Sequence, residues 1–77
     1  MENYNGYTNH KTWNIALHLN NDPTLYGLVL DTSYDYKDLV LFLHSMCVIN
    51  TIDNVYFDDR DLNISELDIL LQDIRDL

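Results

Sequence analysis

The stretch NISELDILLQDIRDL, residues 63–77, decides the fold class of this 77-residue chain. Asn63 stands three residues before Glu66, which is the spacing of a capping box, where two side chains satisfy free backbone N–H groups at a helix start. Apolar residues then recur at helical spacing, and acidic or polar residues cover the other faces. The stretch therefore predicts an amphipathic helix. Its apolar positions are Leu67, Leu70, Leu71, Ile74 and Leu77.

A second helix is predicted from YTNHKTWNIALHLNND, residues 7–22. Thr8 or Asn9 can cap its start by accepting a hydrogen bond from a free backbone N–H. Trp13 leads an apolar face that continues through Ala16 and Leu17 at helical spacing, widened by Ile15 and Leu19. The opposite side of this helix carries a polar stripe of Lys11, Asn14, His18 and Asn21.

The next residues predict a helix stop followed at once by a helix start. Asn20 or Asn21 is expected to take the left-handed conformation that often ends a helix. Asp22-Pro23 then fits an N-cap followed by proline at the first helical position. Residues 23–31, PTLYGLVLD, suit a short helix or a buried strand, and we favour the helix.

The middle of the chain, SYDYKDLVLFLHSMCVIN, predicts a long central helix capped by Ser33. Its periodicity breaks in residues 50–63, where Val55-Tyr56-Phe57 is expected to form a short strand or a buried loop anchor. The buried face of the central helix is expected to be Leu39, Val40, Phe42, Leu43, Met46 and Cys47.

The fold predicted from these segments is all-α, a compact bundle of three to four short helices with an extended N-terminal lead-in over residues 1–8. It forms one small domain, residues 1–77. A minor alternative is an α+β fold with a short strand near residues 54–57.

The charge of the chain limits its partners. Thirteen acidic and four basic residues give a net charge of −9, while 47% apolar residues supply enough material for a folded core. Such a chain repels nucleic acid and anionic membranes, so neither is expected as a direct partner. A basic protein surface is the favoured partner. Because no signal peptide and no membrane-length apolar run is found, a soluble, cytoplasmic protein is expected.

Motifs for catalysis or metal binding are weak. The segment DRDLNISELDIL begins like an EF-hand, but Ile64 and Leu70 stand where the loop needs glycine and glutamate. His44 and Cys47 have the spacing of a base and nucleophile, yet core packing explains them better in so apolar a segment. With no His/Cys metal spacing and no glycine-rich phosphate loop, we expect no cofactor, no metal and no enzymatic activity.

The acidic C-terminal third is the remaining signal. Residues 53–77 hold eight acidic residues against two basic ones. Such a surface usually only keeps a small protein soluble. The alternative is that carboxylates on a rigid helix and its leading loop imitate a phosphate backbone. The candidate contact residues are Asp58, Asp59, Asp61, Glu66, Asp68, Asp73 and Asp76, and the polar stripe of Lys11, Asn14, His18 and Asn21 is a second candidate surface.

The first helix also carries a family resemblance. Its residues Tyr7-Thr8-Asn9, Thr12-Trp13-Asn14, Ala16-Leu17 and Asn21-Asp22 resemble the signature Y/W-T-N-x-x-T-W-x-x-x-L-x-x-x-N-D of a family of small, mostly uncharacterised proteins of phages, plasmids and other mobile elements. The end LNISELDILLQDI is similar to that family's C-terminal helix. Lys11 and His18 depart from the family pattern, which has an acidic and an aromatic residue there. The resemblance implies a small helical fold and a mobile-element setting, with no known catalytic residues. Small acidic phage proteins are often anti-CRISPR or anti-restriction inhibitors.

We therefore expect a non-enzymatic, phage-type inhibitor that works in the host cytoplasm. It would occlude the DNA or RNA site of a CRISPR effector or restriction enzyme by acidic mimicry. The alternative is a small structural or regulatory adaptor that binds a partner, or a second copy of itself as a homodimer, through an apolar patch. Rising salt weakens the charge-driven complex far more than the apolar one.

Overall fold

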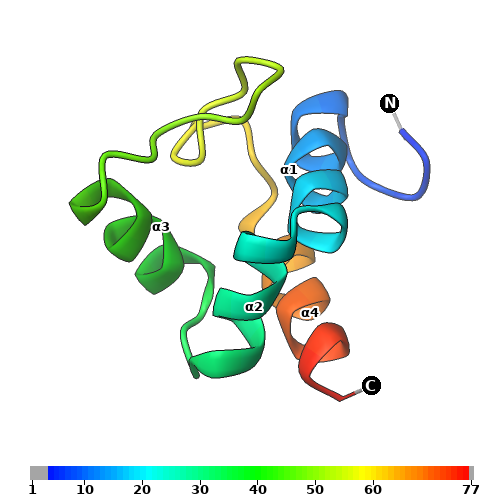
Figure 1. Ribbon diagram of the computed structural model, residues 1–77. Coiled ribbons are helices and arrows are strands. Elements are labelled where there is room, and N and C mark those ends of the chain that lie inside the picture. Colours follow the sequence, from blue (N-terminus) through cyan, green and yellow to red (C-terminus); the bar gives the residue numbers. More distant parts are fainter. Residues whose placement is uncertain (1–3, 77) are drawn as a thin grey trace.

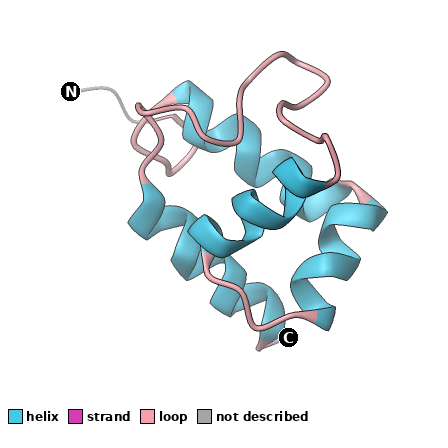
Figure 2. Ribbon diagram, turned by 90° about the vertical axis from the view of Figure 1, so that its left-hand side faces the viewer, coloured by secondary structure: helices cyan, strands magenta, loops and turns pink. Residues whose placement is uncertain are grey.

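Four helices make up the fold in the computed structural model, which describes residues 4–76. They are α1 (His10–Asn21), α2 (Pro23–Asp31), α3 (Tyr36–Ser45) and α4 (Ile64–Arg75). Within residues 4–76 no strand forms (Figure 2). The only β pairing in those residues consists of two isolated bridges, Tyr4 with Tyr7 and Asn50 with Tyr56. The predicted all-α bundle is confirmed, and the helix interpretation of residues 23–31 is confirmed with it.

Helix α4 is the common partner in the packing. It contacts α1, α2 and α3, and α1 also packs on α2 (Figure 1). One apolar core gathers side chains from all four helices and from the long loop between α3 and α4, and its largest fully buried members are Tyr36 and Phe57. On α1 the buried apolar residues are Ile15, Ala16 and Leu19, while Trp13 is only partly buried and stacks with Tyr4 and His10. Leu77, predicted at the end of the apolar stripe, lies outside the described residues.

Asp22 joins α1 to α2 without any intervening linker. Its backbone N–H bonds the carbonyl of His18 at the end of α1, and its carboxylate accepts from the N–H groups of Thr24 and Leu25 at the start of α2. A residue that caps the next helix needs extended backbone, and Asp22 has φ −88° and ψ 116°. The left-handed helix end predicted at Asn20 or Asn21 is therefore wrong.

Helix α3 is shorter at both ends than predicted. Asp35, not Ser33, caps its start by accepting from the N–H of Asp38. At its end Cys47 has φ 62°, and the N–H groups of Cys47 and Val48 bond back to His44 and Leu43. This is the Schellman pattern, which stops a helix at a left-handed residue.

The Schellman stop changes the exposure of the last predicted core positions. Met46 is 53% exposed, Cys47 is also exposed, and Phe42 is only partly buried. The prediction that Met46 and Cys47 are buried is wrong. The chain turns away from the axis of α3 at the Schellman motif, so their side chains do not reach the core. Leu39, Val40 and Leu43 are buried as predicted.

Two turns occur where the sequence predicts irregular or extended chain. Residues 49–57 fold back on themselves, with backbone hydrogen bonds from Thr51 N–H to Val55 and from Phe57 N–H to Ile49. Val55 and Phe57 are buried, so the loop-anchor alternative is the one observed. In the lead-in, residues 4–7 form a tight turn around Asn5-Gly6, both with positive φ, which is an arrangement Asn-Gly sequences favour.

Candidate protein-binding surface

The starts of α1 and α4 are tied together by polar side chains. The Glu66 carboxylate accepts from both the N–H and the hydroxyl of Thr8, at 2.9 and 3.0 Å. Asn63 accepts from the N–H of Glu66 at 3.1 Å, which is the predicted cap, but its own N–H donates to the hydroxyl of Thr12. Half of the predicted capping box therefore forms within α4, and the other half is replaced by contacts to α1.

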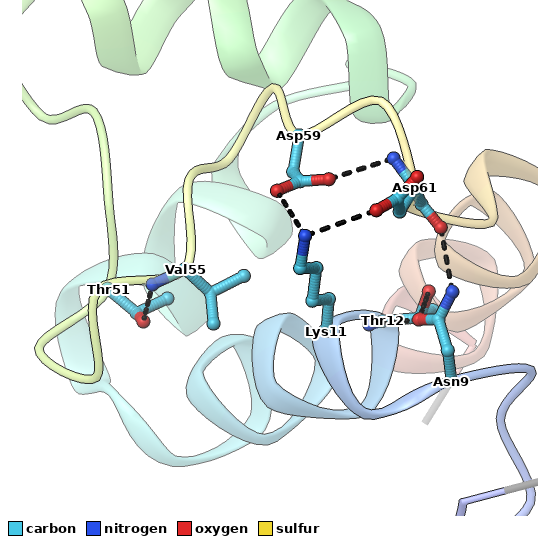
Figure 3. Close-up of polar contacts among 7 residues, drawn as sticks. All are labelled: Asn9, Lys11, Thr12, Thr51, Val55, Asp59 and Asp61. Atoms are coloured by element: carbon cyan, nitrogen blue, oxygen red, sulfur yellow. Dashed lines mark hydrogen bonds and ion pairs between the residues drawn. The ribbon is translucent and has the colours of Figure 1, made fainter.

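Lys11 lies between two of the three predicted loop carboxylates (Figure 3). Its ammonium is 3.0 Å from Asp59 and 3.1 Å from Asp61. Asp59 also accepts from the backbone N–H of Asp61 at 2.8 Å, and this hydrogen bond, followed by Lys11, holds the pKa of Asp59 below its usual value. The same two carboxylates raise the pKa of Lys11. Asp59, with 15% of its side chain exposed, therefore holds the loop in place rather than facing outward.

Asn14 and His18 bind the tip of the same loop. Asn14 is 2% exposed, and its amide donates to Asp53 at 2.8 Å while its carbonyl accepts from the Thr51 hydroxyl at 2.9 Å. His18 Nε2 lies 3.1 Å from the same Asp53 oxygen. The hydrogen bond from Asn14, then that from His18, lowers the pKa of Asp53. This part of α1 is thus an internal contact face.

The polar stripe predicted as a second exposed surface does not face outward as a unit. Asn14 is buried, Lys11 and His18 are partly buried in contacts to the loop, and Asn21 alone is exposed. The prediction of an exposed stripe is wrong, because helix periodicity indicates which residues share a face but not which loop covers that face.

The other predicted acidic residues differ in their exposure and in the contacts that their carboxylates make within the fold. Asp68 accepts from the N–H of Tyr36 at 2.7 Å and so supports the start of α3. Asp58 is 60% exposed by side chain and lies 3.9 Å from His44. Asp73 and Asp76 are exposed, and neither side chain has a hydrogen-bond partner within residues 4–76.

Three of these acidic residues, Glu66, Asp73 and Asp76, lie on α4 or at its C-cap, and Asp61 lies in the loop just before it. We call these four residues the α4 acidic row. Asp61 is tied by its carbonyl to Asn9, next to the Thr8 that binds Glu66. Glu66 and Asp73 are two helical turns apart, about 10 Å, and both line a hollow of about 350 Å³ beside Tyr7. Burial, and then the charges of Glu66 and Asp73, raise the pKa of Tyr7.

Within residues 4–76, the one ion pair made to this row is that of Lys11 with Asp61. Lys11 is shared by Asp59 and Asp61. The Arg75 guanidinium donates to the carbonyls of Val29 and Tyr34, so it secures the end of α2. Lys37 and Arg60 line a different hollow, between α3 and the loop. Among residues 4–76, no lysine or arginine lines the hollow that Glu66 and Asp73 share.

A larger hollow of about 390 Å³ lies between α2 and α3, and the sequence did not predict it. We call it the α2–α3 groove. The available signal was the run of apolar residues around Met46, which the prediction assigned to the core. Its apolar lining is Leu25, Leu28, Leu43, Met46, Val48, Ile52 and Phe57, and His18 and Asp22 are among its polar residues.

Across residues 4–76, no three His, Cys, Asp or Glu side chains gather closely enough to hold a metal ion. None of the helices there combines the length and apolarity needed to cross a bilayer.

Comparison with known proteins gives a family without an assigned activity. No curated protein and no solved structure matches the chain. A family described as a family of unknown function, DUF7249, matches residues 1–77, the whole of the sequence. The chain therefore belongs to the DUF7249 family.

Proposed function

We propose that this chain is a non-enzymatic inhibitor that binds the basic nucleic-acid site of a host defence protein, a CRISPR effector or a restriction enzyme, in the host cytoplasm. Its carboxylates would take the place of phosphates and so exclude DNA or RNA. The observation that carries the proposal is the α4 acidic row, in which Glu66 and Asp73 share a hollow that no lysine or arginine lines.

The hydrogen bonds and ion pairs within the fold indicate which carboxylates remain available to a partner. Asp59, Glu66 and Asp68 hold internal structure, so we assign them a supporting role. Asp61, Asp73 and Asp76 keep exposed carboxylates, and Asp58 adds another from the loop. Because α4 and the loop are fixed to α1, little side-chain and backbone freedom would be lost on binding, which favours affinity.

Spacing sets how many cations such a row can engage. Glu66 and Asp73 are about 10 Å apart along the helix, and Asp73 and Asp76 about 4.5 Å. A DNA strand presents a phosphate about every 3.4 Å along the duplex axis. The row is sparser than a phosphate backbone, so we expect it to occupy a few Lys or Arg side chains at the centre of a basic groove rather than its whole length.

The test reverses charge at exposed positions that make no internal bond. In a DNA-cleavage assay with a panel of purified CRISPR effectors and restriction endonucleases, the wild-type chain should inhibit at least one enzyme. The variant Asp73→Lys/Asp76→Lys should weaken that inhibition at least about tenfold, as loss of close charge pairs does.

The matched control is Asp31→Lys/Asp38→Lys, which changes the net charge equally at exposed positions on α2 and α3, outside the row. It should inhibit like the wild type, with circular dichroism confirming that both variants are folded. An equal loss of inhibition in both variants would show that net charge alone, and not the acidic row, causes the inhibition. An absence of inhibition across the whole panel would refute the proposal.

A further inference from the structure

The α2–α3 groove lies between two helices that both pack on α4, and residues of the long loop complete its lining. Its floor is apolar and its rim is formed by side chains that the fold leaves exposed. Met46, just past α3, is 53% exposed, and Ile52, at the turn of the long loop, is 87% exposed. Both line the groove.

Exposed apolar side chains are concentrated beside this groove. Of the eight large apolar side chains exposed within residues 4–76, half fall in residues 46–56. These four are Met46, Ile49, Ile52 and Tyr56. Single exposed apolar residues are ordinary on a protein surface, but Met46 and Ile52 line the apolar groove itself, and exposed apolar side chains gathered at a hollow indicate an interaction site.

The charges at the rim indicate the chemistry of the occupant. Asp22 lines the groove, and Asp53, which follows Ile52 and contacts the groove-lining His18, has 55% of its side chain exposed. In the part of the chain that the structure describes, no lysine or arginine lines the groove. A second copy would bring the same carboxylates and another net charge of −9 to this rim, so like-charge repulsion disfavours it.

We propose that the α2–α3 groove receives an amphipathic helix of a partner protein, one with an apolar face flanked by Lys or Arg. Apolar anchors at helical spacing would fill the hollow against Leu25, Leu28 and Leu43. The flanking cations would pair with Asp22 and Asp53. This docking uses residues outside the α4 acidic row, so it stands or fails separately from the mimicry proposal.

The probe is a fluorescent 14-residue peptide of Leu and Lys with leucines at i, i+3, i+4 and i+7, titrated with the full chain by anisotropy. Two control peptides are a scrambled sequence of the same composition and a version with Glu for every Lys. The amphipathic basic peptide should bind, and each control should bind at least about tenfold more weakly, since both apolar register and charge contribute.

The variant Met46→Glu/Ile52→Glu makes the test specific. It adds negative charge, which would strengthen a purely electrostatic attraction to a basic peptide, yet it should weaken binding at least about tenfold, as loss of central apolar anchors does. Both positions are exposed, so the fold should persist. Leu41→Glu, on the exposed face of α3 and outside the groove, should bind the peptide like the wild type.

Three results would overturn the proposal. They are undiminished binding by Met46→Glu/Ile52→Glu, equal binding of the scrambled peptide, or a wild-type dimer in sedimentation that this variant dissociates, which would make a second copy the occupant. The variant Asp73→Lys/Asp76→Lys should still bind the peptide. The groove proposal can therefore be judged even if the mimicry proposal fails.

Discussion

The hydroxyl of Thr51 donates a 2.9 Å hydrogen bond to the side-chain carbonyl of Asn14, which lies 37 residues earlier in the chain. Both residues are almost fully buried. The Thr51 oxygen also accepts from the N–H of Val55, and the Asn14 amide donates to Asp53. This pair therefore links the middle of α1 to the turn of the long loop.

Replacing Asn14 with alanine should destabilise the fold. The Thr51 hydroxyl would lose its acceptor inside the protein and Asp53 would lose a donor, at a cost of about 1–3 kcal/mol. For a domain of this size each kcal/mol lowers the melting temperature by about 4–8 °C. Asn21→Ala, at an exposed position of the same helix, should change stability by less than about 0.5 kcal/mol. Equal urea midpoints for the two variants would contradict the structural role of Asn14.

Replacing Glu66 with alanine should loosen the junction between α1 and α4. The Thr8 N–H and hydroxyl would both lose a charged acceptor, and we expect a loss of about 1–2 kcal/mol because the site is only partly buried. Asp73→Ala is the matched control, since it removes a carboxylate from the same side of α4 without breaking a described hydrogen bond. Urea unfolding followed by circular dichroism measures the stability of both variants. If Asp73→Ala were as destabilised as Glu66→Ala, loss of negative charge and not loss of the Thr8 hydrogen bonds would be the cause.

Replacing Tyr36 with phenylalanine should leave a buried carbonyl without its partner. The Tyr36 hydroxyl donates to the Phe57 carbonyl at 2.6 Å, and the side chain is fully buried. The expected cost is about 1–3 kcal/mol, measured by urea unfolding, whereas Tyr56→Phe, on the exposed side of the loop, should be neutral. Equal stability of the two variants would argue against this bond.

Tyr36 should also be visible in an alkaline titration. Burial, followed by the charge of Asp58, raises the pKa of Tyr36. Its contribution to stability is then complete below the unfolded value near 10 and falls as pH rises above it. Absorbance at 295 nm should show one tyrosine of six that ionises only on unfolding, and Tyr36→Phe should remove that step.

The lowered pKa values of Asp53 and Asp59 predict acid sensitivity. Their folded-state pKa values lie below the unfolded value of about 3.9. Their contribution is therefore complete above that value and is lost as pH falls through the folded pKa. Urea midpoints measured from pH 6 to pH 2 should fall less steeply below pH 4 in Asp53→Asn than in the wild type. Parallel curves for the two proteins would show that Asp53 does not contribute to acid sensitivity. The other carboxylates titrate in both proteins, so their effect is the same in the two curves.

The helices were predictable where their ends are fixed by neighbours in sequence. Asn9, Asp22 and Asn63 each cap a helix through an N–H two or three residues later, which is a local relationship that the sequence displays. The ends of α3 were not predictable in this way. Ser33 and Asp35 are both plausible caps, and nothing in the apolar run through Met46 signals that Cys47 takes the left-handed conformation.

The candidate surface was harder to predict because it depends on contacts between distant residues. Lys11 and Asn14 look exposed on a helical wheel, but the loop that binds them lies roughly 40 to 50 residues later. The same contacts turn Asp59 from a candidate ligand into an internal support. The α2–α3 groove is likewise lined by residues from two helices and the long loop, far apart in the chain, and no single segment encodes it.

The single-residue junction at Asp22 has a mechanical consequence. A hinge needs at least one residue free to change its backbone angles, but Asp22 is bonded to both helices and Pro23 has a fixed φ. Helices α1 and α2 should therefore move as one rigid unit. A residue inserted at this junction would rotate α2 away from α4. The turn of the long loop is fixed to α1 as well, through the buried pair of Asn14 and Thr51, so a partner would meet a surface whose shape is largely set before binding.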